Sequence, residues 1–151
     1  MVGAKETLSI RRSHLLLYLL SKIGIIDHDR LVKLVFILSN KLKEVALTAD
    51  IPFKYNFRCE GTILFSTDLD EDLARLTRMG FVETQVKILD DVFNIRVHEY
   101  KLTKYGEEVA RRTGEELGQS RKTIDELIKE YRRKSEGKLD EEIASMLREG
   151  P

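Results

Sequence analysis

The sequence predicts a mainly helical fold with one small antiparallel β-hairpin and a helical C-terminal extension. Three observations predict it: two apolar runs with helical spacing in the first third, a capped helix that starts near Thr67, and two alternating runs after it. At 151 residues the chain is long enough for one domain with a sizeable core.

The first third of the chain predicts two helices. Ser13 is a good N-cap for the first helix, and Gly24 ends it. Residues 25–26 then form a short extended piece, and Asp27 or Asp29 caps the second helix. Because apolar side chains surround almost the whole second helix, we expect it to lie at the centre of the core.

The third predicted helix starts at Ser66 or Thr67. Thr67 and Asp70 have the spacing of a capping box, and Gly80 ends the helix as a glycine C-cap. Its inward side is formed by leucines at helical spacing, namely Leu69, Leu73 and Leu76.

A β-hairpin is predicted directly after this helix. Residues 82–88 alternate between apolar and polar, Asp90–Asp91 form a turn, and residues 93–97 alternate on a returning strand. Thr103 then caps a fourth helix. This two-stranded element is the candidate wing of the fold.

The rest of the chain is more polar and strongly helical. Thr123 and Glu126 form a further capping box, and Gly137 separates two short amphipathic helices. Such short helices are not stable alone in water, so they pack back on the domain or against a partner chain.

We therefore divide the chain into a domain at residues 8–113 and an amphipathic helical extension at residues 114–151. Apolar residues of the extension are the candidate dimer or partner interface: Ile124, Leu127, Ile128, Tyr131, Ile143 and Leu147. A homodimer built by this extension is the expected assembly.

Composition restricts the class of protein. Lysine plus arginine and aspartate plus glutamate both total 26, which removes the basic excess of a bulk nucleic-acid coat. The single Cys59 allows no intramolecular disulfide and favours a reducing cytoplasm. Residues 15–20 are the longest apolar run and are too short to span a bilayer. The many charged residues are typical of thermophile proteins.

No residue pattern indicates a cofactor, a metal or a catalytic site. His14, His28 and His98 lie far apart in sequence, and Cys59 has no ligand neighbour. The aspartates at positions 68, 70 and 72 resemble the start of a calcium loop, but Leu73 stands where that loop needs glycine. Phosphate-binding and nucleophile motifs are absent from the sequence, so we expect no enzyme.

Nucleic-acid binding is the function with the most specific candidates. A 100° step per residue puts Arg75 and Arg78 on the outer face of the third helix, where arginine can bind guanine. Four acids between residues 66 and 79 oppose phosphate contact at the same helix. The candidate nucleic-acid-binding residues are Arg75, Arg78, Lys87, Arg96, Lys101 and Lys104.

The order of three helices, a hairpin and the run Tyr100-x-Leu-Thr-x-x-Gly106 resembles winged helix-turn-helix domains over residues 10–113. More narrowly, residues 33–41, 53–57 and 66–83 are similar to the YwgA-type and Panacea-like (SocA-like antitoxin) group. The first resemblance implies a DNA-binding regulator, and the second implies protein partners.

The sequence thus predicts a cytoplasmic regulatory binding protein with a winged-helix fold. The first hypothesis is a DNA-binding transcriptional regulator that acts on double-stranded DNA. The alternative is a winged-helix protein–protein interaction module, antitoxin-like or adaptor-like, that does not read DNA.

Overall fold

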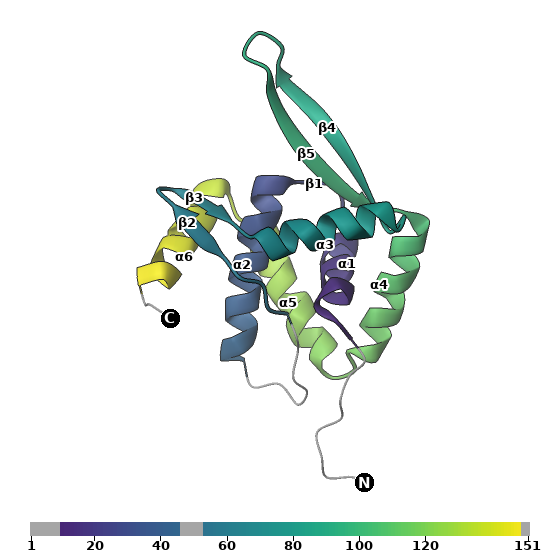
Figure 1. Cartoon of the computed structure of the whole chain (residues 1–151). Coiled ribbons are helices and arrows are strands. Elements are labelled where there is room, and N and C mark those ends of the chain that lie inside the picture. The colour runs from purple at the N-terminus through teal and green to yellow at the C-terminus, as the bar shows by residue number, and fades with distance from the viewer. Residues whose placement is uncertain (1–9, 46–52, 149–151) are drawn as a thin grey trace.

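The computed structural model describes residues 10–45 and 53–148, which form a helical body with one long projecting hairpin (Figure 1). Along the chain the described elements are α1 (Arg12–Ile23), β1 (Ile26–Asp27), α2 (His28–Glu44), β2 (Arg58–Glu60), β3 (Ile63–Phe65), α3 (Thr67–Arg78), β4 (Val82–Asp90), β5 (Ile95–Leu102), α4 (Lys104–Glu116), α5 (Ser120–Arg132) and α6 (Glu136–Arg148). The mainly helical class with a small antiparallel sheet is confirmed. None of the described helices is long and apolar enough to cross a membrane.

The first two helices lie where the sequence predicts them, with one difference at a cap. The N-cap of α1 is Arg11 rather than Ser13, because the backbone N–H of Arg11 donates to Nδ1 of His14 at 2.9 Å and starts the helix earlier. Asp27 caps α2, and its Oδ2 accepts from the backbone N–H of Arg30 at 3.1 Å. Seven consecutive or nearly consecutive apolar residues of α2 are buried, which confirms its central position.

One three-stranded antiparallel sheet contains the predicted hairpin. Its strand order is β1–β5–β4, with Ile26 opposite Tyr100 and Thr84 opposite Tyr100 on the other side. The short extended piece and the hairpin of the sequence prediction are therefore both confirmed. Beyond its base, the β4–β5 hairpin leaves the helical body and extends away from it (Figure 1).

A second, two-stranded sheet was not expected from the sequence. Strands β2 and β3 pair from Arg58 opposite Phe65 to Glu60 opposite Ile63, and Gly61 adopts a positive φ of 61° in the turn. Strands of three residues are too short to give a recognisable alternation. Because this hairpin lies between α2 and α3, those helices are not joined by the turn of roughly three or four residues found in a helix-turn-helix.

The N-cap of α3 lies one residue before Thr67, the predicted capping-box residue. Ser66 is the N-cap, since its hydroxyl oxygen accepts from the backbone N–H of Leu69 at 3.3 Å. Gly80 has a φ of 85°, which fits its predicted role in ending the helix. The three predicted leucines point inward with exposed fractions of 4% or less.

The helical extension packs against the body and shares its core. Helix α5 starts before Thr123, directly after Gly118 with its φ of 57°, and Gly137 lies inside α6 rather than between helices. The boundary predicted after residue 113 falls inside α4, while residues 8 and 151, the predicted outer limits, lie outside the described residues. The apolar residues of α5 and α6 join the same core as those of α1 and α2.

Helix α4 packs closely on the rest of the body at two glycines. Thr103 caps α4 as predicted, since its Oγ1 accepts from the backbone N–H of Gly106 at 3.2 Å. A Cβ at Gly106 would overlap the carbonyl oxygen of Phe81, and one at Gly114 would lie 2.9 Å from the Tyr18 ring. Both positions therefore need a residue without a side chain.

We predict that Gly106→Ala destabilises the fold by at least ~2 kcal/mol, because the Phe81 backbone cannot move away without shifting β4. Urea unfolding followed by circular dichroism measures the change. Gly137→Ala is the matched control within α6, where the added Cβ meets nothing closer than 4.0 Å. It should stabilise by roughly 0.5–1 kcal/mol, because alanine is the better helix former. Equal effects of the two substitutions would contradict this packing.

Candidate functional site

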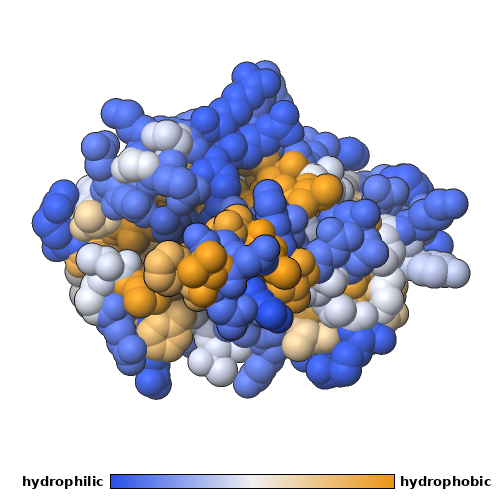
Figure 2. All heavy atoms as spheres, turned by 90° about the horizontal axis from the view of Figure 1, so that it is seen from above, coloured by the Kyte–Doolittle hydropathy of each residue, from blue (hydrophilic) through white to orange (hydrophobic). Residues whose placement is uncertain are grey.

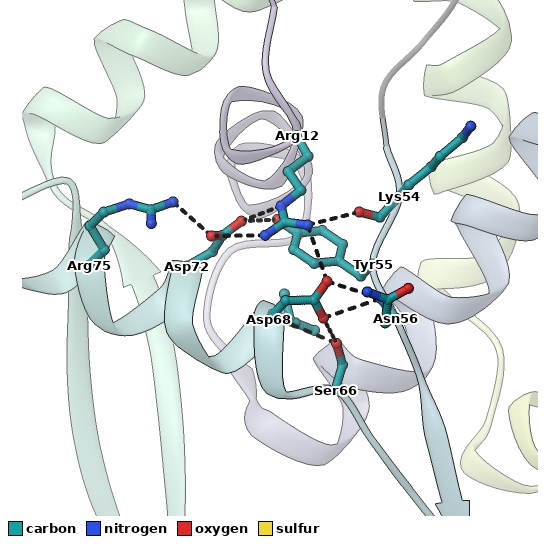
Figure 3. Close-up of polar contacts among 9 residues, drawn as sticks. Arg12, Lys54, Tyr55, Asn56, Ser66, Asp68, Asp72 and Arg75 are labelled. Carbon is teal, nitrogen blue, oxygen red and sulfur yellow. Dashed lines mark hydrogen bonds and ion pairs between the residues drawn. The ribbon is translucent and has the colours of Figure 1, made fainter.

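The buried carboxylate of Asp72 is the centre of the polar cluster beside α3 (Figure 3). Its side chain is 1% exposed although α3 is a surface helix. Oδ2 accepts from Nε of Arg12 at 2.9 Å and from the hydroxyl of Tyr55 at 2.8 Å. Oδ1 accepts from Nη2 of Arg75 at 2.7 Å. A buried carboxylate needs such partners, because an unpaired charge in the interior is very costly.

Arg12 connects this carboxylate to a second one. Nη1 of Arg12 donates to Asp68 at 3.1 Å and to the carbonyl oxygen of Lys54 at 3.2 Å. Its guanidinium also lies over the Tyr55 ring, 4.5 Å from the ring centroid, where a cation–π attraction adds to the hydrogen bonds. The cluster therefore joins α1, the link at residues 53–56 and α3 (Figure 3).

Asp68 is held by neighbours on both sides. Its carboxylate accepts from the hydroxyl of Ser66 at 2.6 Å and from the backbone N–H of Asn56 at 3.1 and 3.2 Å. Burial opposes ionisation of Asp68, but these hydrogen bonds and the charge of Arg12 outweigh it and lower its pKa. Burial first, and then the hydrogen bond to Asp72, raise the pKa of Tyr55, so that tyrosine stays a neutral donor.

These contacts change the charge expected on the outer face of α3. From the sequence, four acidic residues of α3 are expected to repel phosphate. In the structure, however, Asp72 is buried and Asp68 faces Arg12. Asp70 lies 2.7 Å from Nε2 of His28, at the start of α2. Glu71 is the remaining acid of this helix, and it is exposed. The acidic first turn therefore serves mainly to attach α3 to its neighbours.

The two arginines predicted on the outer face of α3 are exposed there. Arg75 is 51% exposed and is partly engaged, because it donates to Asp72. Arg78 makes no ion pair or hydrogen bond within residues 10–45 and 53–148 and is available to a ligand.

The two basic residues of the hairpin lie on opposite faces, and only one of those faces is turned toward α3. Lys87 is opposite Val97 and Arg96 is opposite Ile88, so the two cations point to opposite faces of the hairpin. The hydroxyls of Thr77 and Thr84 lie 2.8 Å apart, which turns the face of Arg96 toward α3.

The remaining two predicted cations lie apart from this face. Lys101 is on the face of Lys87, where its Nζ lies 3.1 Å from the carboxylate of Glu83. Lys104 is the first residue of α4 and is exposed. The six predicted nucleic-acid-binding residues thus divide into an α3 side with Arg75, Arg78 and Arg96, and other sites with Lys87, Lys101 and Lys104.

The outer part of the hairpin is apolar and uncovered. Sequence alternation placed Val86 and Ile88 on the same face as the buried Val82. They are nevertheless 51% and 54% exposed, because the helical body does not extend beyond Thr84 along the hairpin. Seen from above, along the hairpin, apolar side chains gather in the middle of the face among hydrophilic ones (Figure 2). The exposed large apolar residues of the hairpin are Val86, Ile88, Leu89, Val92, Phe93 and Ile95.

The tail residues predicted as an interface are mostly covered by the chain itself. Four of them are 2–7% exposed within the core, namely Ile124, Ile128, Tyr131 and Ile143. Leu127 is partly buried against the same core, and Leu147 is 46% exposed. Packing on the domain, one of the two expected alternatives, is thus what α5 and α6 do in this chain.

The side chains of the described residues that can ligate a metal are dispersed. Among them, no group of three or more histidine, cysteine, aspartate or glutamate side chains is placed to hold a metal ion. His28 contacts Asp70 and lies 6.1 Å from the Tyr100 ring, and Cys59 is an exposed free thiol. Burial and the charge of Asp70 raise the pKa of Tyr100 to about 12.

We predict that Asp72→Asn lowers the free energy of unfolding by about 2 to 3 kcal/mol. The loss is below that of a fully buried pair, because Arg12 and Arg75 remain partly solvated. Urea unfolding near neutral pH measures it. The matched control is Glu71→Gln, one residue earlier and exposed, which should stay within roughly 0.5 kcal/mol of the wild type. If Asp72→Asn also changed the free energy of unfolding by no more than roughly 0.5 kcal/mol, the stabilising role of the cluster would be contradicted.

Comparisons of the chain with models of known protein families, with characterised proteins and with solved structures give no significant match.

Proposed function

We propose that this chain is a winged-helix regulatory binding protein that acts through protein–protein contact at the β4–β5 hairpin. The winged-helix assignment rests on the order of α1, β1, α2 and α3 before the hairpin, and on the β1–β5–β4 sheet that the hairpin completes. The β2–β3 insertion between α2 and α3 is the feature that distinguishes this chain from a plain helix-turn-helix.

The observation that carries protein contact is the apolar outer part of the hairpin. Val92 is 85% exposed and Phe93 is 75% exposed, and four further large apolar side chains of the hairpin are 47–58% exposed. Single exposed apolar residues are ordinary, but several together on one projecting element are typical of an interaction surface. Asp90 and Asp91 lie at the hairpin turn, where their charge disfavours contact with phosphate.

A second copy of the chain is the partner that fits this surface best. Among the described strands β4 is the last of its sheet, so its outer edge has backbone groups that no other described strand pairs with. Two antiparallel β4 strands centred on Gln85 would place Glu83 of one copy opposite Lys87 of the other, and the reverse. The same register places Val82 opposite Ile88 and Thr84 opposite Val86, which extends the apolar face across both copies. The proposed homodimer thus uses the hairpin, not the tail.

We predict a dimer of the 17.5 kDa chain in solution, which the double substitution Val86→Lys and Ile88→Lys converts to a monomer. Static light scattering coupled to size exclusion measures the mass. Both positions are exposed in the single chain, so the fold should be unaffected. Leu147→Lys is the matched control, because Leu147 is an exposed apolar residue of α6. A monomeric wild type would refute the homodimer, and a dimer that survives the hairpin substitutions would refute the hairpin as its interface.

DNA binding is the second candidate, and the charges of α3 favour it. Three of the four acids of α3 are directed to Arg12 or His28, while Arg75 and Arg78 face outward and Arg96 lies on the same side of the sheet. Arginine is the side chain best suited to read guanine or to hold phosphate.

If DNA is bound, fluorescence anisotropy with random duplex DNA should show affinity that falls steeply between roughly 50 and 200 mM salt. Arg78→Ala should reduce the salt slope by about 1, since one phosphate contact is lost. Lys87→Ala should leave it unchanged, because Lys87 lies on the other face of the hairpin. Absence of binding at the lower salt would remove the DNA candidate.

A further inference from the structure

A cleft of about 880 Å³ lies between the start of α1, the C-terminal half of α3, and α4. This volume is within the range of small-molecule sites. Its apolar lining comes from three elements and the turn after α3: Leu17, Leu76, Met79, Phe81 and Val109. Its polar lining comes from the first turn of α1 and from α3: Arg11, Arg12, Ser13, His14, Asp72 and Arg75.

The charged groups of the cleft have unused donors, while its carboxylate is already engaged. Asp72 supplies the one carboxylate among the described lining residues, and both of its oxygens already accept from Arg12, Tyr55 and Arg75. Arg12 is likewise engaged, by Asp68, Asp72 and the Lys54 carbonyl. The charged groups of the cleft therefore suit an anionic ligand better than a cationic one.

Arg11, Arg75 and His14 provide the unused donors. Arg75 uses Nη2 on Asp72, and no other hydrogen bond of its guanidinium occurs within the described residues. Arg11 is exposed and makes no ion pair with any described residue. Nδ1 of His14 accepts from the Arg11 backbone, which leaves Nε2 as the nitrogen that can donate. Two cations and an imidazole N–H thus border the apolar lining.

We propose that this cleft binds a small apolar carboxylate, with the carboxylate held by Arg75 and Arg11 and the hydrocarbon part against Leu76, Met79 and Phe81. Arginine binds a carboxylate through two parallel N–H groups, which suits a ligand with one anionic end. The apolar lining excludes a simple inorganic anion as the best ligand, because that ion would leave the lining uncovered. The described lining contains no residue of the hairpin, and it shares Arg75 with the candidate DNA-binding residues.

The experiment is isothermal titration of the full chain with octanoate and with phenylacetate. Octanamide and inorganic phosphate serve as the neutral and the purely anionic comparisons. Binding of both carboxylates, at least about tenfold tighter than either comparison, is the expected result. Octanamide binding as tightly as octanoate, phosphate binding as tightly as the carboxylates, or no binding of either carboxylate would overturn the proposal.

Two variants act on the cleft by different means. Arg75→Ala removes the charged donor, and Asp72 keeps Arg12 and Tyr55 as partners. Met79→Glu places a carboxylate at a lining position that is 59% exposed, so the fold can accept it. Each should weaken octanoate binding by about tenfold or more. Arg78→Ala is the matched control, because Arg78 is an exposed arginine of the same helix outside the cleft lining.

Thermal unfolding without ligand, compared with that of the wild type, verifies that each variant is folded. Unchanged octanoate affinity in a folded Arg75→Ala or Met79→Glu chain would overturn the assignment of the site to this cleft. An equal loss in Arg78→Ala would do the same, since it would trace the effect to the general charge of α3.

Discussion

The Asp72 carboxylate is the constraint on which the position of α3 depends. Helix α3 follows a long link after α2, so sequence proximity does little to place it against the body. Asp72 binds Arg12 from α1, Tyr55 from that link and Arg75 from its own helix, and it does so while 1% exposed. A charge buried in this way needs hydrogen-bond partners, and its contacts with Arg12 and Tyr55 from other elements specify one orientation of the helix about its axis.

That orientation decides which side chains α3 presents to a partner. With Leu69, Leu73 and Leu76 in the core and Asp72 against Arg12, the outer face is left with Glu71, Ala74, Arg75 and Arg78. The same rotation sets Arg75 at the edge of the cleft beside α1 and places Thr77 against Thr84 at the base of the hairpin. One polar cluster thus fixes the outer face of α3, the cleft and the root of the apolar hairpin.

Features with a local chemical signal were predictable from the sequence. Asp27, Thr103, Gly24 and Gly80 lie at helix ends as capping chemistry requires, and the alternation after Gly80 gave the hairpin. The burial of Asp72 had a usable signal, since it lies three residues after Leu69 and four before Leu76, on the inward stripe. No sequence pattern identified Arg12 and Tyr55 as its partners, because they are distant from Asp72 in sequence. The exposure of Val86 and Ile88 was likewise not predictable, since alternation does not show how much of a strand is covered by the rest of the protein.

A double-mutant cycle on Arg12 and Asp72 tests most directly whether this contact holds α3 in place. Urea unfolding of Arg12→Gln, Asp72→Asn and the double variant gives the coupling free energy of the pair. We predict a coupling of about 1.5 kcal/mol or more, with the double variant less destabilised than the sum of the single ones. Additive effects, within roughly 0.3–0.5 kcal/mol, would contradict the central role of the contact.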